Sequence, residues 1–322
     1  MAKKIKNVKS KLKPETSSSD DDESGCHDTS EYKFVYYPDL KQKYKQYANK
    51  TGELLLKGLN EQMAKILKRI TEQMEEQKLD VKKTIDEGYY IYNEKPSQGV
   101  GKDKGITWSD EEYEHLGFQY MYLKVKSTQR FTEVYNMLVR AHNKNYFEKF
   151  KSMKSVDIVS IGGGPSYELY ALRVFFKRFY KNIHITLTTI DLNNNWKVPN
   201  KIFDVQFVQG SFYDKDVINT IHKYDLSIMS YVMFHYFDKP KKSNLIINMM
   251  SGRMKMMLVN SRVKNIGTYD YIKRGKRGKR GNIKTYDLIA ETDNRQVAVT
   301  TEDISSNLPD KKCKIPFLDV PF

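Results

Sequence analysis

The stretch VDIVSIGGGPSYEL, residues 156–169, carries the strongest structural signal of this chain, because a short apolar strand runs into three glycines and then into a helix. Only a backbone without Cβ turns so tightly and lets a ligand approach the main chain, and the helix N-terminus presents free N–H groups. The stretch therefore predicts a nucleotide-cofactor loop. A dinucleotide loop would have a third glycine at position 167, where this chain has Tyr167, so the pattern disfavours a nicotinamide cofactor.

Further apolar runs downstream of the loop alternate with helical or polar segments. Residues 183–190 predict a strand that ends in Asp191, an acid at a strand tip where a ribose diol would lie. Residues 205–212, 224–237 and 255–260 predict three more strands, and residues 244–250 predict a helix before the last of them. Two runs at 285–290 and 296–300 predict an antiparallel hairpin. The order indicates an α/β fold.

With these motifs in this order, residues 130–300 resemble the class I S-adenosylmethionine-dependent methyltransferases. The resemblance implies a Rossmann-like sheet, mostly parallel with a terminal antiparallel hairpin, preceded by a helical N-terminal region. It also implies S-adenosyl-L-methionine as the cofactor. The cofactor contacts that it implies are the glycine loop Gly162, Gly163 and Gly164 at the methionine half, Asp191 at the ribose, Ser211 and Phe212 beside the adenine, and Ser230 beside the methyl.

Three positions depart from the pattern of that family. The acid that usually lies two residues before the first glycine is Ser160 here, and the third small position is Ser166. Glu168 is a candidate to supply the missing acid, so we count it among the expected cofactor-binding residues. The third departure is Ser211, where many relatives carry Asp, and this weakens the expected adenine contact.

The segment after the fourth strand bears on the methyl acceptor. It lacks an Asp/Asn-Pro-Pro-aromatic motif, which argues against methylation of the exocyclic adenine amine, and it lacks a cysteine for a covalent route to pyrimidine C5. Its candidate catalytic residues are Tyr231, which could orient a planar substrate, and His235, which could act as a general base near neutral pH. Packing roles remain the alternative for both, because methyl transfer needs mainly an aligned nucleophile.

The length of 322 residues predicts one domain of about 150 to 200 residues and an accessory region. We expect a disordered basic and acidic tail at 1–35, a helical accessory region at 36–129 and the methyltransferase domain at 130–322. Residues 38–87 show an apolar stripe at three- and four-residue steps, which predicts a long helix packed on the domain, with a coiled-coil dimer as the alternative. Residues 107–112 predict a capped helix start.

Several tyrosines lie among lysines in the helices that precede the glycine loop. They could stack on bases, but aromatic residues at helical spacing more often belong to a core, and we expect core positions for them. They are Tyr113, Tyr120, Tyr122, Tyr135 and Tyr146.

The net charge of +15 favours an anionic partner, with RNA first, bound through the basic tail and the Lys273–Gly281 loop, which repeats Lys-Arg-Gly three times. The chain has no apolar run of membrane-spanning length and no hydrophobic signal core at its start, so no membrane partner is expected. The two cysteines, Cys26 and Cys313, indicate neither a disulfide framework nor a zinc site, and we expect no metal. These features predict an intracellular protein of the nucleus, nucleolus or cytoplasm.

Three functions remain open from the sequence. The first is an RNA methyltransferase; the glycine loop and the Asp191 and Trp196 pair resemble, faintly, eukaryotic ribosomal RNA uridine-N3 methyltransferases. The second is a methyltransferase of a small molecule or a protein. The third is a non-catalytic RNA-binding subunit that keeps the fold. The target atom and the oligomeric state do not follow from the sequence.

Overall fold

The computed structural model describes residues 34–38, 44–48, 50–93, 108–232, 245–246, 248–261, 283–290 and 295–301. Within these residues, seven strands form one sheet in the order β5-β4-β3-β6-β7-β9-β8. Their bounds are β3 Ser155–Ile161, β4 His184–Asp191, β5 Gln206–Gln209, β6 Leu226–Ser230, β7 Met256–Ser261, β8 Lys284–Ala290 and β9 Arg295–Thr300. Strands β3 to β7 pair in parallel, and β9 pairs antiparallel with both β7 and β8. This order confirms the predicted Rossmann-like class I methyltransferase sheet.

Short helices connect the parallel strands. Helix α5 runs from Tyr167 to Phe179, as the sequence pattern predicts, and is followed by α6 Lys197–Ile202 and α7 Lys215–Ile221. Successive side chains of a strand point to opposite faces of the sheet. In β7, Met256 and Leu258 accordingly join one buried cluster, whereas Met257 and Val259 join another. The sheet is therefore covered on both faces, as the near-continuous apolar runs of its strands require.

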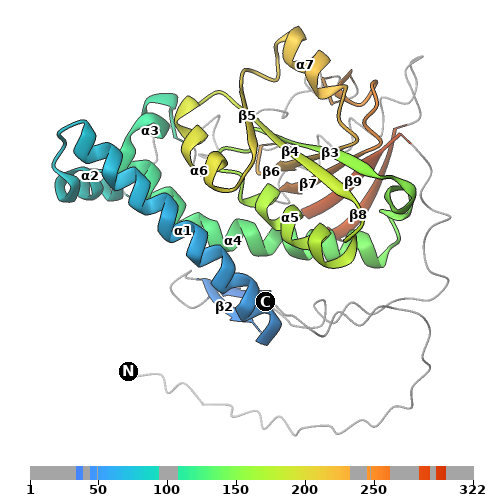
Figure 1. The fold of residues 1–322 in the computed structure, drawn as a ribbon, viewed down its shortest axis with the longest axis horizontal. Helices are drawn as coiled ribbons and strands as arrows, with labels where there is room; N and C mark the ends of the chain where they lie inside the picture. The colour runs from blue at the N-terminus through green and yellow to red at the C-terminus, as the bar shows by residue number, and fades with distance from the viewer. Residues whose placement is uncertain are drawn as a thin grey trace, which may run out of the picture.

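The helices before the sheet pack against the first of these clusters. They are α1 Lys50–Glu76, α2 Val81–Asn93, α3 Asp110–Glu114 and α4 Leu116–Asn143, and a single 3-10 turn at Glu148–Ser152 follows them. In Figure 1, α1 lies across α4, while α7 lies at the end of the molecule away from them. The apolar stripe of α1 is buried inside the chain, because Leu59, Ile66 and Met74 have no exposed surface.

The predicted continuous helix over residues 38–87 is wrong in two places. Residues Phe34–Pro38 and Tyr44–Ala48 form an antiparallel hairpin of strands β1 and β2, and the helical part is divided between α1 and α2. Lys78 lies at the break with a φ of 58°, a left-handed conformation that ends the helix. The expected domain boundary after residue 129 falls inside α4, which continues from Leu116 to Asn143.

The predicted helix start at residues 107–112 is confirmed. Ser109 caps α3, because its hydroxyl accepts a hydrogen bond from the N–H of Glu112 at 3.3 Å, and the Glu112 carboxylate accepts one from the N–H of Ser109 at 2.8 Å. This reciprocal pair satisfies two donors that a helix N-terminus otherwise leaves free. No described helix combines the length and apolarity needed to cross a membrane.

Candidate functional site at the carboxyl edge of the sheet

A cavity of about 380 Å³ lies at the carboxyl ends of β3, β4 and β6. Strand β3 pairs with β4 on one side and with β6 on the other, so the connections diverge at this edge. Open α/β sheets bind ligands at such a switch point. We call ten of the lining residues at or after the strand ends the sheet wall: Gly162, Gly163, Gly164, Glu168, Asp191, Trp196, Gly210, Phe212, Ser230 and Tyr231.

The glycine loop forms the floor of the sheet wall. Gly162 has a φ of 64° and Gly164 a φ of 49°, which side-chain-bearing residues rarely adopt. A Cβ at Gly162 would lie 2.7 Å from Val232 Cγ2, and a Cβ at Gly163 would collide with the side chains of Ser160, Thr189 and Glu168. A side chain at either position would meet neighbouring protein atoms, so the tight turn at the end of β3 requires glycine there.

Asp191 lies at the end of β4 and closes the loop. Its carboxylate accepts a hydrogen bond from the N–H of Gly164 at 2.8 Å and another from the N–H of Asn193 at 3.0 Å. Burial raises the pKa of Asp191, whereas these backbone donors oppose the shift. A carboxylate at this position can accept hydrogen bonds from a pair of hydroxyl groups in the cavity.

Glu168 lies beside the serine that replaces the usual acid. Ser160 donates its hydroxyl to Glu168 Oε1 at 2.6 Å, so the first turn of α5 brings a carboxylate to the end of β3. Glu168 is buried, and burial raises its pKa to about 7, while the Ser160 hydrogen bond opposes the shift. The structure therefore brings the candidate acid to the place where the sequence lacks one.

Of the remaining residues that we expected to contact the adenine and the methyl group, two line the cavity and one does not. Phe212 and Ser230 line the cavity, and the Ser230 hydroxyl accepts a hydrogen bond from the Asn260 amide at 3.3 Å. Ser211 does not line the cavity, because its hydroxyl turns to the N–H of Tyr213 at 3.2 Å. Gly210 lines the cavity in its place.

Of the two candidate catalytic residues, Tyr231 lines the cavity and His235 lies outside the described residues. Tyr231 has a φ of 62°, a strained conformation for an aromatic residue that points to a functional constraint. Its hydroxyl donates to Glu133 Oε1 at 3.1 Å, and the guanidinium of Arg130 covers its ring. Two residues of α4 thus hold Tyr231 in place.

The other side of the cavity comes from the helices that precede the sheet. We call this lining the helical wall: Tyr92, Asn93, Trp108, Asp110, Tyr113, Tyr122, Lys126 and Arg130. The ring of Tyr92 stacks on Trp108 at a centroid distance of 5.3 Å, and Tyr122 lies 5.9 Å from Trp196 of the sheet wall. The two walls are therefore in direct contact.

The sequence predicts core positions for the tyrosines of these helices, and the cavity lining corrects this prediction in part. Tyr135 and Tyr146 occupy the core as expected, but Tyr113 and Tyr122 pack against the core and also line the cavity. The available signal was the capped helix start at Ser109, together with the aromatic residues Trp108 and Tyr113 that flank it.

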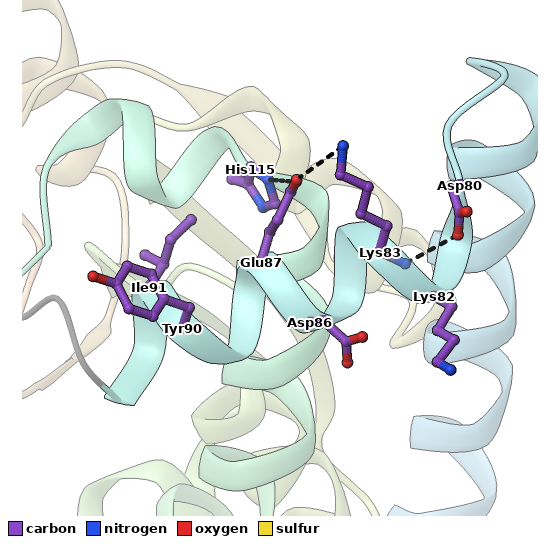
Figure 2. A pocket seen from close by; sticks show the side chains of 8 residues that line it. All are labelled: Asp80, Lys82, Lys83, Asp86, Glu87, Tyr90, Ile91 and His115. Carbon is purple, nitrogen blue, oxygen red and sulfur yellow. Dashed lines mark hydrogen bonds and ion pairs between the residues drawn. The ribbon is translucent and has the colours of Figure 1, made fainter.

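A second, more open hollow of about 630 Å³ lies along α2. Figure 2 shows that Glu87 pairs with two of the other lining residues, His115 at 3.5 Å and Lys83 at 3.8 Å. None of its lining residues belongs to a strand or to the glycine loop, so the cavity between the two walls is the better candidate site. Among the described residues, no group of three His, Cys, Asp or Glu side chains could hold a metal ion.

No protein-family model matches this sequence, and no curated protein sequence matches it. Similar solved structures include a putative class I S-adenosylmethionine-dependent methyltransferase from Listeria monocytogenes, with 13% identity over 79% of this chain and 91% of that chain and a TM-score of 0.43. A putative S-adenosylmethionine-dependent methyltransferase from Methanococcus maripaludis has 14% identity, coverages of 64% and 98%, and a TM-score of 0.36. Magnesium protoporphyrin IX methyltransferase from Synechocystis PCC 6803, with bound cofactor, has 11% identity, coverages of 62% and 100%, and a TM-score of 0.36.

At these sequence identities and TM-scores, the similar structures carry no argument about the activity of this chain. The chain has the class I methyltransferase fold, which its own strand order already defines. The finer resemblance to ribosomal RNA uridine-N3 methyltransferases is not confirmed.

Proposed function

We propose that the protein is an S-adenosylmethionine-dependent methyltransferase that acts on RNA. The observation that carries this proposal is the sheet wall, in which a glycine loop with two residues at positive φ closes onto the Asp191 carboxylate at the switch point of the sheet. This arrangement combines an accessible main chain, a ribose-binding acid and flat apolar side chains in one cavity.

The residues of the sheet wall fit this cofactor. Gly162 and Gly164 line the cavity with a tight main-chain turn, Asp191 offers its carboxylate to the ribose hydroxyls, and Phe212 offers a ring to the adenine. When bound, S-adenosylmethionine supplies an electrophilic methyl group. The protein then has to align the acceptor, for which the held Tyr231 is our candidate, with His235 as the candidate base.

Charge and aromatic content support RNA as the acceptor. The chain carries a net charge of +15, and the helical wall adds Lys126 and Arg130 together with the rings of Tyr92 and Tyr122. Cations that meet phosphates and rings that stack on bases are the usual means of binding single-stranded nucleic acid. The basic tail and the Lys273–Gly281 loop, which lie outside the described residues, complete the proposed RNA contacts.

Cofactor binding tests the first part of the proposal. Asp191→Ala should weaken binding of S-adenosylhomocysteine about tenfold or more, since it removes charge-assisted hydrogen bonds worth roughly 1.5 to 3 kcal/mol each. Asp216→Ala removes an exposed acid of α7 and is the matched control. Isothermal titration calorimetry on folded protein decides, and equal affinities for the two variants would remove Asp191 from the site.

Labelled cofactor tests the acceptor. We expect methyl label in the RNA fraction when the purified protein is incubated with S-adenosylmethionine and separated cellular RNA, protein and metabolites. Label in metabolites or protein instead would favour the second function, for which the enclosing aromatic side chains of the helical wall are the supporting observation. RNA binding without any cofactor binding would favour a non-catalytic subunit.

The Lys273–Gly281 loop can be tested separately. Serine at its six cationic positions should weaken RNA binding and flatten the dependence of log affinity on log salt, because each lost phosphate contact removes about 0.7 to 0.9 of a unit of slope. Cofactor affinity should not change. Identical slopes for wild type and variant, measured between about 50 and 200 mM salt, would exclude this loop from RNA binding.

A further inference from the structure

The edge of the sheet opposite the cavity carries a set of lysines. Strands β3 to β7 pair in parallel, so all of them begin at this edge, which we call the amino edge. Strand β8 begins there too, because β7 and β8 both pair antiparallel with β9. Five lysines lie at a strand start or up to three residues before one, and a sixth lies in the last turn of α5. We call them the amino-edge lysines: Lys154, Lys177, Lys181, Lys223, Lys255 and Lys284.

The pairing of the strands arranges these lysines in a row. In the sheet, β4, β3, β6, β7, β9 and β8 are successive neighbours, and Ser155 at the start of β3 pairs with His184 at the start of β4. At the other end of the row, Met256 and Lys284 both pair with Thr300. Neighbouring strands lie about 4.8 Å apart, so the row extends over roughly 24 Å. None of the amino-edge lysines lines the cavity.

The acids near the row are paired with other cations. Arg253 lies 2.5 Å from Asp157 and 2.9 Å from Asp225, and Lys151 lies 2.6 Å from Glu148. These pairs neutralise the carboxylates at the starts of β3 and β6. The row is therefore a surface of net positive charge.

Four of the amino-edge lysines are available to a partner. Lys154, Lys177, Lys181 and Lys223 are exposed, and none of them forms an ion pair within the part of the chain that the structure describes. A row of exposed cations at intervals of a few ångströms is complementary to a chain of phosphates.

The apolar surface separates RNA from a membrane as the partner. Proteins that lie on membranes combine cations with apolar side chains that enter the lipid. The large hydrophobic residues with high exposure in the described ranges lie in the helical region before the sheet, or just after β4 and β5 at the carboxyl edge. The amino edge offers cations without such residues, which favours a phosphate backbone.

We propose that the amino edge is a second RNA-docking surface, on which Lys154, Lys177, Lys181 and Lys223 bind phosphates of the acceptor. This inference rests on RNA as the proposed acceptor and narrows its class. The seven residues of β3, at about 3.3 Å each, place the two edges of the sheet roughly 20 Å apart. An RNA that contacts both the amino edge and the cavity is therefore a long or folded RNA and not a nucleotide or a short strand.

A charge-matched pair of variants tests the surface. The amino-edge variant has glutamine at Lys154, Lys177, Lys181 and Lys223. The control variant loses the same number of exposed lysines from α1 and α2, with glutamine at positions 57, 65, 68 and 82. Transfer RNA is the probe, because it is folded and long enough to reach both edges, and fluorescence anisotropy on the full chain measures its affinity.

The two variants should differ in both affinity and salt dependence. The amino-edge variant should bind transfer RNA about tenfold more weakly or worse, and the slope of log affinity against log salt should flatten by about 3 units, because each lost phosphate contact removes about 0.7 to 0.9 of a unit. The control variant should keep its slope within about one unit of wild type. Equal flattening in the two variants would show that only net charge matters and would overturn the surface.

A cofactor fragment shows whether the cavity is intact. 5′-Methylthioadenosine carries only the adenosine end of S-adenosylmethionine, and its affinity should be the same in wild type and both variants, because the substituted lysines lie outside the cavity. Cations in the last turn of a helix also offset the helix dipole. If that were the role of these lysines, the amino-edge variant would lose stability with an unchanged RNA slope, and the inference would be wrong.

Failure of this inference is distinguishable from failure of the proposed function. Wild-type protein that binds transfer RNA but not methylthioadenosine would leave the surface standing and remove the cofactor. Wild type that binds methylthioadenosine but not transfer RNA would remove RNA as the acceptor and this surface with it. Binding to vesicles of phosphatidylserine and phosphatidylcholine in place of RNA, lost in the amino-edge variant, would show that the partner is a membrane.

Discussion

The two walls of the cavity are built on different principles. The sheet wall presents the main chain of the glycine loop and the side chains that lie at the ends of the parallel strands, and the N–H of Gly164 joins the loop to the Asp191 carboxylate. The helical wall presents long aromatic and cationic side chains from α2, α3 and α4. This difference indicates separate roles for the two walls. Backbone geometry suits a cofactor that many enzymes share, whereas side chains from added helices suit recognition that is particular to this chain.

The largest expected effect tests how the walls are joined. Glu133 of α4 accepts hydrogen bonds from Tyr231 at 3.1 Å and from Asn260 at 3.0 Å, both on the sheet side. Because its side chain is only 13% exposed, Glu133→Ala leaves several donors without an acceptor, and we expect a loss of about 4 kcal/mol in unfolding free energy. Urea denaturation measures it.

Glu72→Ala supplies the comparison for that experiment. Glu72 pairs with Arg69 on the solvent side of α1, and exposed ion pairs contribute little to stability. The loss in Glu133→Ala should therefore far exceed that in Glu72→Ala. Similar losses would mean that the walls are held by apolar packing and not by this network.

The second effect concerns the pH dependence of Glu168. Its pKa of about 7 in the folded chain exceeds the ordinary value of 4.5, so between these values the folded chain binds more protons than the unfolded chain. This residue therefore lowers the unfolding free energy as pH rises through that window. The neighbouring titratable groups are Arg130 and Tyr122 of α4, Asp191 of β4 and Tyr167, and burial keeps both tyrosines neutral by raising their pKa values.

Glu168→Gln removes this titration. The unfolding free energy of the variant relative to wild type should rise by about 3 kcal/mol between pH 4 and pH 8. Urea denaturation across this range is the measurement, and a constant difference between the two proteins would show that Glu168 does not titrate there. A falling difference would mean that its pKa is lowered and not raised.

The third effect tests the sheet wall alone. Gly163→Ala places a methyl group against the buried side chains of Ser160, Thr189 and Glu168, and overpacking of this kind should cost about 2 kcal/mol of stability. Binding of S-adenosylhomocysteine should weaken with it. Gly58→Ala in α1 has room, with Tyr170 at 3.5 Å, and should stabilise the helix by up to about 1 kcal/mol. Thermal denaturation compares them, and a stable Gly163→Ala protein would show that the loop can shift.

The walls also differ in how far the sequence predicts them. The sheet wall was predictable because its residues directly follow apolar strands, so Gly162 and Asp191 are placed by local pattern alone. Glu168 was predictable as a candidate acid, because Ser160 lies where related enzymes usually have an acid and Glu168 lies in the first turn of the helix that follows the loop. Ser211 was not, since the turn of its hydroxyl toward Tyr213 depends on a local loop conformation.

The helical wall depends on packing between segments far apart in the chain. Tyr92 and Tyr122 reach the cavity only because α2 and α4 pack together, and helical spacing alone predicts core positions for such rings. The left-handed backbone of Tyr231 likewise has no sequence signal, because only Gly commonly adopts it. Residues 34–48 were expected to lie partly in a helix, but their strands pair with each other in a hairpin.

The smallest expected effect concerns the orientation of the helical wall. Ser109→Ala removes the cap of α3, the helix that carries Tyr113 to the cavity, and should cost about 1 kcal/mol of stability. The matched control is Ser152→Ala at an exposed serine of the 3-10 turn, remote from the cavity. Because α3 contributes side chains only to the helical wall, binding of methylthioadenosine should change by less than about threefold. A larger loss of that ligand, measured by calorimetry at a temperature where both variants are folded, would mean that the helical wall also contacts the adenosine end and that the division between the two walls is too sharp.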